Sequence, residues 1–284
     1  NMLDSAYYAT AETQYGAGNW SKAKTLLGDY LQKYPNGVFV AKANYYKAES
    51  HYQLKEYKEA LVGYDFVLGN SWSNFSENSA RRAAGIAYEQ KDLEKAKRYY
   101  SELRNMAMGQ ENLQVAYNGL MLTSYGLNEH SNASAFADTV LSMPGLDENI
   151  MHNAMLIKAK SLMKGDNKEE ALNVFKELET AKIGAIAAEA RYNIAYIYYL
   201  QNMLKEAEAA AGNTIQLSGG NDYWVIKSYI LIADILVKQK DYFNAKATLQ
   251  SIIKNSKIPE LKNEATQKLK EVKKLETKKS KLSE

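Results

Sequence analysis

Cysteine is absent from the 284-residue chain. This absence excludes a disulfide framework, thiolate catalysis and cysteine-ligated zinc. It leaves the compartment open, because a protein without cysteine suits the cytosol and the periplasm equally well.

Histidine and glycine motifs are also scarce. The three histidines, His51, His130 and His152, show no metal-ligand spacing such as HExxH. The clustered glycines, in "GAGN" and "SGGND", match neither a phosphate-binding P-loop nor the GxGxxG pattern. No candidate nucleophile has a base beside it in a triad-like arrangement. The sequence therefore predicts a protein that is not an enzyme and that binds no metal or cofactor.

Long apolar runs are missing as well. The stretch "YNIAYIYYL" is shorter than the roughly 18 apolar residues of a membrane-spanning helix. No signal-peptide pattern opens the chain. Since the first residue is Asn1, we expect the native start to lie upstream, and we expect no membrane insertion of the part seen here.

The charge of the chain is unevenly distributed. The net charge is +3, and the segment from Lys254 to Glu284 alone contains ten Lys and five Glu. This tail could bind nucleic acid or acidic lipid. Its lysines, however, alternate with glutamates, lack aromatic neighbours and surround an apolar stripe. A solvated helix face is the favoured interpretation, and we predict no nucleic-acid partner.

What the chain does contain is a repeated pattern. Three prolines and sixteen glycines are few enough to favour long helices. Phrases such as "HYQLKEYKEAL" return along the chain, and each includes one alanine that sets the register. These alanines lie 36–38 residues apart, a period typical of solenoids. They are Ala23, Ala60, Ala96, Ala133, Ala171, Ala207 and Ala245.

Each repeat reads as helix, short turn, helix. A second small residue precedes the register alanine by twelve positions in six of the seven units, and Met121 replaces it in the fourth. A polar patch such as "KE", "KD" or "GDN" separates the two positions and suits a tight turn. We expect the alanines to lie where two helix backbones cross closely, since a larger residue there would overpack the crossing.

This pattern resembles the tetratricopeptide repeat: a small residue, an aromatic, a turn, a bulky residue, then Ala followed by an aromatic or Leu, as in Ala60/Tyr64 and Ala96/Tyr100. The resemblance implies an all-α fold, a right-handed α-solenoid of about seven helix-turn-helix units in residues 4–257. The predicted units span residues 4–40, 41–76, 77–113, 114–151, 152–187, 188–225 and 226–257.

The two ends of the predicted array differ. Residues 258–284 read as a capping helix with a Lys-rich tail, in which Leu261, Ala265 and Leu269 begin an apolar stripe. The first unit starts almost at residue 4, without a capping helix. Because solenoids need polar caps, this favours either excision from a longer array or burial of that end, including self-association with a partner copy.

Tyrosines follow one face of the predicted first helices. Eight residues before the register alanine five units carry Tyr, and the other two carry Met163 and Val237. Further positions three and seven residues earlier lie on the same helical face. The candidate groove residues are Tyr8, Glu12, Tyr15, Tyr45, Glu49, Tyr52, Arg81, Tyr88, Asn118, Tyr125, Tyr192, Tyr196, Tyr199 and Asp234.

By resemblance, the first helix of each unit lines the concave surface, so this face would hold an extended peptide or a helix of a partner. Tyrosine suits recognition because it combines a large apolar body with a polar tip. The same rings could instead pack neighbouring units together, and Glu12 and Glu49 could be either ligand contacts or solvated charges. The carboxylate clamp of chaperone-tail-binding members is not matched, because Arg81 and Asn118 stand isolated.

The leading functional hypothesis is a non-catalytic scaffold that binds a protein or peptide. An alternative is a structural part of a bacterial envelope or outer-membrane assembly, because "GAGNWSKAKTLLGDYLQKYP" and "LKEYKEALVGYDFVL" are similar in style to bacterial envelope-associated arrays. That resemblance favours a periplasmic or outer-membrane-associated location, with the cytoplasm as the alternative. A third hypothesis is the sensor part of a larger regulator.

Overall fold

The computed structural model describes residues 2–282, and that part of the chain is all-α and contains no strand. This confirms the predicted fold class. The helices are α1 Met2–Gly16, α2 Trp20–Lys33, α3 Val40–Gln53, α4 Tyr57–Leu68, α5 Ser76–Glu89, α6 Leu93–Met106, α7 Gln110–Gly126, α8 His130–Leu141, α9 Glu148–Lys164, α10 Lys168–Leu178, α11 Gly184–Leu200, α12 Leu204–Leu217, α13 Asp222–Lys238, α14 Tyr242–Asn255 and α15 Pro259–Leu282.

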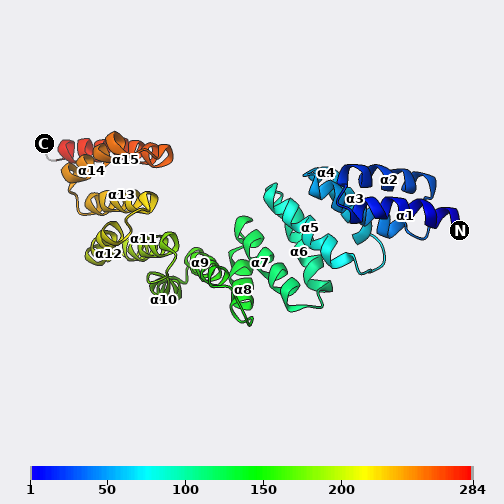
Figure 1. Ribbon diagram of the computed structural model, residues 1–284. Coiled ribbons are helices and arrows are strands. Elements are labelled where there is room, and N and C mark those ends of the chain that lie inside the picture. Colours follow the sequence, from blue (N-terminus) through cyan, green and yellow to red (C-terminus); the bar gives the residue numbers. More distant parts are fainter. Residues whose placement is uncertain (1, 283–284) are drawn as a thin grey trace. The chain divides into compact units, whose positions relative to one another are not determined.

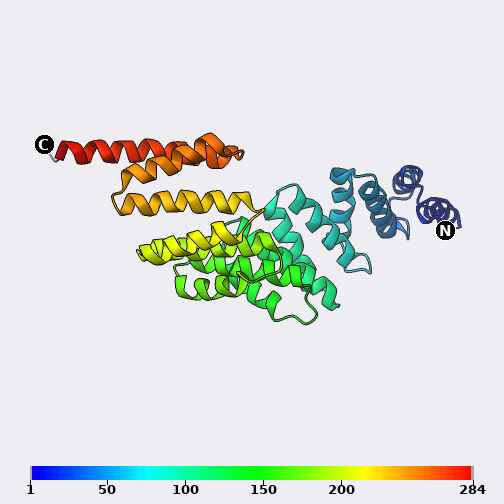
Figure 2. The ribbon, with the colours of Figure 1, turned by 60° about the vertical axis from the view of Figure 1, so that its left-hand side comes forward.

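The chain divides into two compact units, residues 1–143 with α1–α8 and residues 144–284 with α9–α15. Within each unit every helix packs against the next one in sequence (Figure 1). The odd-numbered helices also touch one another within a unit, as α11 does with α9 and with α13. Figure 2 shows α13, α14 and α15 lying side by side. The odd-numbered helices therefore form a continuous layer inside each unit.

One residue with a left-handed backbone closes the turn inside every helix pair. It lies five positions before the register alanine, with φ between 61° and 73°. In the second pair, the amide of Lys55 donates to the carbonyl of Tyr52 and that of Glu56 donates to His51, both at 2.9 Å. These are the two bonds of a Schellman ending. The residues in this conformation are Gly18, Lys55, Lys91, Asn128, Asp166, Asn202 and Lys240.

The register alanines are fully buried, each with 0% exposure. The prediction that they occupy close helix crossings is thereby supported. Between α3 and α4 the contact is tight: a Cβ added to Gly63 would lie 2.7 Å from the Cβ of Ala48. At the corresponding position of the fourth pair, Met121 is also buried, so this departure from the pattern leaves the packing closed.

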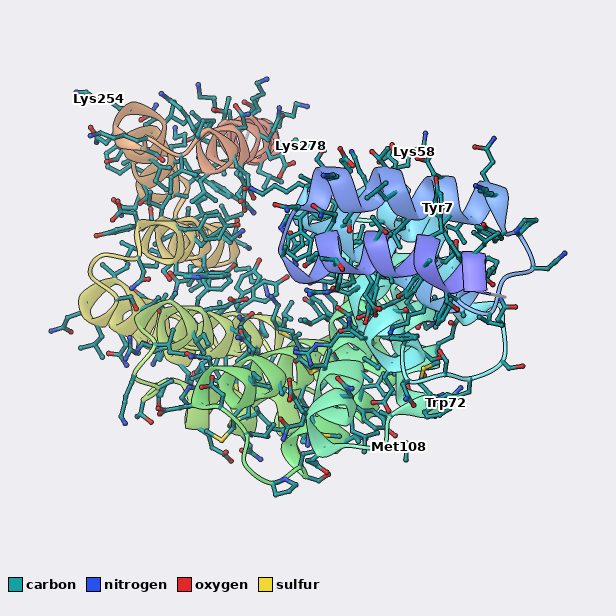
Figure 3. The ribbon with its side chains drawn as sticks, turned by 45° about the vertical axis from the view of Figure 1, so that its right-hand side comes forward. Tyr7, Lys58, Trp72, Met108, Lys254 and Lys278 are labelled. Atoms are coloured by element: carbon teal, nitrogen blue, oxygen red, sulfur yellow. The ribbon has the colours of Figure 1, made fainter. Side chains whose placement is uncertain are left out.

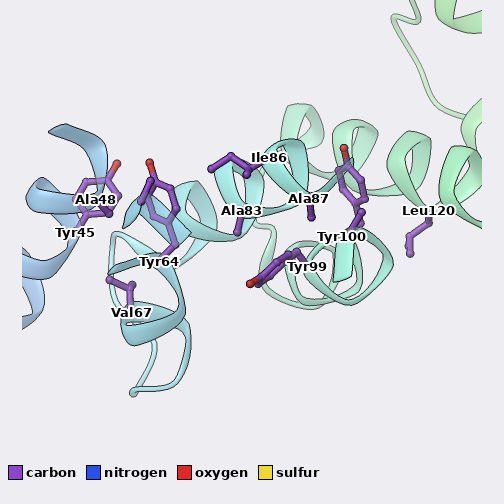
Figure 4. Close-up of a cluster of buried hydrophobic side chains, with 13 residues drawn as sticks. Tyr45, Ala48, Tyr64, Val67, Ala83, Ile86, Ala87, Tyr99, Tyr100 and Leu120 are labelled. Carbon is purple, nitrogen blue, oxygen red and sulfur yellow. The ribbon is translucent and has the colours of Figure 1, made fainter. Parts of the chain in front are cut away.

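Tyrosines form much of the core of the first unit. Figure 4 shows Tyr64 of α4 with Tyr45 and Ala48 on one side and Ala83 and Ile86 of α5 on the other. All five side chains are buried in one cluster. Burying an aromatic ring of this size dominates the local packing energy. The abundance of tyrosine therefore has a structural cause in addition to any role at the surface.

The last helix, α15, packs its apolar stripe on the preceding pair. Leu261, Ala265 and Val272 are buried in a cluster with residues of α13 and α14, whereas Leu275 is 42% exposed. The end of the tail, residues 283–284, lies outside the described residues. No helix in the described part of the chain has the length and apolarity that a bilayer crossing demands.

Candidate peptide-binding site

Tyr8 and Tyr45 are buried, so they are not open to a ligand. The ring of Tyr8 stacks on Phe39 at 4.4 Å between centroids, and that of Tyr45 stacks on Phe75 at 4.6 Å. Each Phe is the residue before the next odd-numbered helix. Asn78 also donates a hydrogen bond to the Tyr45 hydroxyl. Burial raises the pKa of Tyr45 to about 12. The packing interpretation applies to these two rings.

The predicted acidic contacts are already paired within the protein. Glu12 accepts a hydrogen bond from Lys42 at 2.6 Å. Glu49 is buried, accepts from the hydroxyl of Tyr64 and lies 3.3 Å from the Nε of Arg82. Both cations belong to the next odd-numbered helix. These carboxylates therefore form ion pairs between one odd-numbered helix and the next. The sequence interpretation did not consider this alternative.

Two further candidate tyrosines of the first unit, Tyr15 and Tyr52, are half-exposed and face neighbours on the same surface. Tyr15 stacks on Tyr46 at 4.1 Å between ring centroids, and the guanidinium of Arg82 lies 4.1 Å from the ring of Tyr52. The pKa of Tyr15 is raised, first by burial and then by the charge of Glu49. Hence this face is a network of ring stacks and cation–π contacts.

The other candidates of the first unit do not join that network as a group. Lys91 lies 5.6 Å from the ring of Tyr88, and Tyr125 meets His130 edge to face at 5.8 Å. Arg81 donates to Glu111 and to Asn112, both on α7. Asn118 is half-exposed on α7. Each of these candidates stays a prediction as a ligand contact.

The second unit brings four candidates together around one hollow. Tyr192, Tyr196 and Tyr199 of α11 and Asp234 of α13 all line a cavity of about 650 Å³. Its wall also includes Met163 of α9 and Val237 of α13, the two residues that replace tyrosine in the predicted ladder, and Glu264, Lys268 and Glu271 of α15. Hence odd-numbered helices α9, α11, α13 and α15 build the hollow.

An aromatic wall runs along α11 in this hollow. The rings of Tyr192 and Tyr196 stack at 6.1 Å with an interplanar angle of 8°, and those of Tyr196 and Tyr199 stack at 6.2 Å and 19°. Trp224 of α13 approaches Tyr192 at 5.3 Å. All four side chains are half-exposed. Their spacing follows from the three- and four-residue steps that place side chains on one helical face.

Ion pairs across neighbouring helices connect the walls of the hollow. Lys160 of α9 donates to Glu189 of α11 at 2.7 Å, a contact between two successive odd-numbered helices. The Nζ atom of Lys268 on α15 donates to both carboxylate oxygens of Asp234 at 2.8 Å. The Nζ atom of Lys227 on α13 donates to both carboxylate oxygens of Glu264 at 3.1 Å. These contacts fix the relative position of the helices that carry the rings. Among the described residues no cluster of His, Asp or Glu is arranged to hold a metal ion.

The sequence interpretation missed several exposed or half-exposed apolar and aromatic residues. Tyr223 and Trp224, which line the hollow, stand at the start of α13, outside the positions that the helical face selected. Trp72 and Met108 are 56% and 81% exposed in the loops after α4 and α6, at one edge of the first unit (Figure 3). One signal in the sequence could have identified the aromatic residues among them: they lie close to the starts of helices, in "DYW" and "SWSNF".

Comparisons with known proteins agree with this architecture. Two models of the tetratricopeptide repeat match the chain, one at residues 5–37 and 227–256 and the other at residues 158–222. A comparison with curated protein sequences gave no significant match.

Solved structures show the same fold at low sequence identity. The apo form of RapI is 12% identical with a TM-score of 0.62, over 93% of this chain and 80% of that one. The apo form of the quorum sensor NprR from B. thuringiensis is 16% identical with a TM-score of 0.61, over 96% and 81%. The C-terminal part of a repeat protein from Cytophaga hutchinsonii is 14% identical with a TM-score of 0.59, over 88% and 96%.

This fold is generally a non-catalytic scaffold for protein interactions, and its members commonly bind proteins or peptides. The repeat matches and the paired helices lead to one conclusion: the chain contains tetratricopeptide repeats, in residues 5–37, 158–222 and 227–256.

Proposed function

We propose that the chain binds a segment of a partner protein in the hollow of its second unit. The observation that carries the proposal is the stacked, half-exposed wall of Tyr192, Tyr196 and Tyr199 beside a cavity of about 650 Å³. Tyrosine is enriched at the energetic centres of protein interfaces because it buries much area with few rotatable bonds. A cavity of this size accepts a few side chains of an extended segment.

The ion pairs support a preorganised site. Lys160–Glu189 and Lys268–Asp234 connect α9 to α11 and α13 to α15. A surface whose rings are held in place before binding loses less conformational entropy when a ligand arrives. The second unit is favoured over the first as the site, because Tyr8 and Tyr45 of the first unit are buried, whereas Tyr192 and Tyr196 of the second unit are half-exposed.

A peptide library displayed on phage and selected on the full chain would test the proposal. We expect selected peptides to lose about tenfold or more in affinity for a Tyr196→Ala variant, as for a residue at an interface centre. Phe243→Ala is the matched control, because Phe243 is 76% exposed on α14 and does not line the hollow. Peptides that bind Tyr196→Ala as tightly as the wild type would contradict the proposal.

The envelope role and the regulator role stay predictions. The full-length gene would separate them. A lipoprotein or secretory signal in its first 30 codons supports the envelope role, and a longer open reading frame that encodes an effector domain supports the regulator. Neither outcome changes the peptide experiment, which uses the chain as it stands.

A further inference from the structure

Three aromatic rings form a corner at one end of the hollow. The rings of Tyr223 and Trp224 meet at 83° with centroids 4.9 Å apart, and the ring of Tyr192 lies 5.3 Å from that of Trp224. All three side chains line the cavity and are half-exposed. We call Tyr192, Tyr223 and Trp224 the aromatic corner. Perpendicular rings present π faces in two directions, the arrangement that encloses a cation.

Carboxylates surround the aromatic corner. The hydroxyl of Tyr223 donates to Glu260 at 3.2 Å, and Glu189 and Glu264 line the same cavity. Burial is the main cause that raises the pKa of Tyr223, and the charge of Glu260 is the second. For Tyr192, burial is again the main cause of the raised pKa, and the charge of Glu264 is the second. Carboxylates therefore lie close enough to these two phenols to disfavour the negatively charged form of each.

The protein already places its own ammonium groups against rings of this hollow. Lys238 lies 3.9 Å from the ring centroid of Tyr199 and donates to the carbonyl oxygen of that residue at 3.1 Å. Lys227 lies 5.8 Å from the ring centroid of Tyr192 while it pairs with Glu264. Both distances are within the range in which a cation and a π face attract each other.

The lysines of the hollow do not give it a positive charge. Its four lysines, Lys160, Lys227, Lys238 and Lys268, are matched by Glu189, Asp234, Glu264 and Glu271 in the same wall. Three of the lysines are paired with three of those acids. Glu260 adds one more carboxylate beside Tyr223.

We infer that the aromatic corner binds a cationic side chain of the partner segment, the ammonium of a lysine, methylated or not, or the guanidinium of an arginine. The inference rests on the proposed function for its biological meaning, but the corner can be tested without any peptide. The ring faces attract the cation, and Glu260, the carboxylate beside Tyr223, favours positive over neutral groups.

Choline and its neutral isostere 3,3-dimethylbutan-1-ol are suitable probes, because they share a shape and differ in charge. We expect choline to bind the full chain with an affinity about tenfold or more above that of the alcohol, measured by saturation-transfer NMR on the methyl protons. Trp224→Leu should remove choline binding, and Glu260→Gln should weaken it. Phe243→Ala should leave it unchanged.

Tyr223→Phe keeps the ring but removes the bond to Glu260, so it should weaken choline binding less than Trp224→Leu does. Circular dichroism on each variant shows whether the chain has kept its helix content. Equal binding of choline and the alcohol, or no binding of choline, would overturn the inference. Choline binding that persists in a folded Trp224→Leu variant would overturn it as well.

A second arm uses the peptides selected on phage. Replacing their lysines with norleucine, or their arginines with citrulline, should cost about tenfold in affinity for the wild type and little for Trp224→Leu. Peptides that bind in the hollow without any such preference would leave the proposed function standing and overturn this inference. Choline binding without any hollow-binding peptide would support the aromatic corner and contradict the proposed function.

Discussion

The Nε atom of Arg82 on α5 lies 3.3 Å from the Oε1 atom of Glu49 on α3, and Glu49 is 6% exposed. The same carboxylate accepts a hydrogen bond from the hydroxyl of Tyr64 on α4. One buried charge thus joins three helices. Asp234 and Lys268 form a comparable link in the second unit, at 2.8 Å between α13 and α15. Repeat proteins of this type are stabilised by such nearest-neighbour contacts.

We expect Glu49→Gln to lower the free energy of unfolding by about 1–3 kcal/mol, because Arg82 loses its charged partner while the amide can still accept from Tyr64. Urea unfolding followed by circular dichroism measures this change. Glu12→Gln is the matched control. The Glu12 side chain is 40% exposed, and exposed ion pairs contribute about 1 kcal/mol or less. Equal losses in the two variants would argue against a special role for the buried pair.

The lowered pKa values of Glu56 and Glu129 lead to a prediction of how the stability of the fold depends on pH. Hydrogen bonds from Lys24 and then His51 lower the pKa of Glu56 below its ordinary value of 4.5, and Lys97 and then Asn132 do the same for Glu129. The folded-state pKa is therefore below the unfolded one. These contacts stabilise the fold above pH 4.5, and the contribution is lost as the pH falls through the lower folded values.

We therefore expect Tm to fall as the pH drops below about 4.5, with a shallower fall in a Glu56→Gln, Glu129→Gln double variant. Thermal unfolding between about pH 7 and pH 3 measures the two slopes. Glu208→Gln serves as control, because Glu208 is exposed on α12. A double variant with the slope of the wild type would contradict the assignment of these two carboxylates.

The repeat could be predicted from the sequence because it depends on local size limits. Where two backbones cross, only a small residue fits, so Ala60 or Ala171 has to recur with the period of the helix pair. The spacing of the left-handed turn residues, from Gly18 to Lys240, follows the same period. Those turns were expected only as polar patches, since non-glycine residues such as Lys55 carry no distinctive signal for a positive φ.

The burial of individual tyrosines could not be predicted in the same way. Tyr8, Tyr45 and Tyr192 occupy the same position of their helices. Phe39 covers Tyr8, whereas Tyr192 stays half-exposed beside Trp224. The difference depends on residues about 30 positions later, at the start of the next odd-numbered helix. A periodic pattern inside one helix contains no information on that neighbour.

The turns lead to a stability prediction. Lys240 adopts φ 64° although a side chain is strained in this region. We expect Lys240→Gly to raise the free energy of unfolding by up to about 1 kcal/mol, because glycine accepts the conformation without a Cβ penalty. Lys270→Gly, in the middle of α15, should instead lower it by about 1 kcal/mol. Urea unfolding distinguishes the two, and a loss of stability in Lys240→Gly would contradict the prediction.

Gly119 and Gly85 give a sharper test of the close helix packing, because both are helical and only one is crowded. A Cβ at Gly119 on α7 would lie 2.4 Å from the ring of Tyr100 on α6, whereas a Cβ at Gly85 on α5 meets nothing within 4 Å. Tyr100 is buried, so its ring has little room to move.

We expect Gly119→Ala to lower the free energy of unfolding by about 1–3 kcal/mol through overpacking. Gly85→Ala should raise it by about 0.5–1 kcal/mol, because alanine loses less backbone entropy in a helix. The two variants make the same chemical change, so any difference in their urea midpoints reports the space available at each site. Gly119→Ala that stabilised the protein as Gly85→Ala does would contradict a close contact between α6 and α7 at this position.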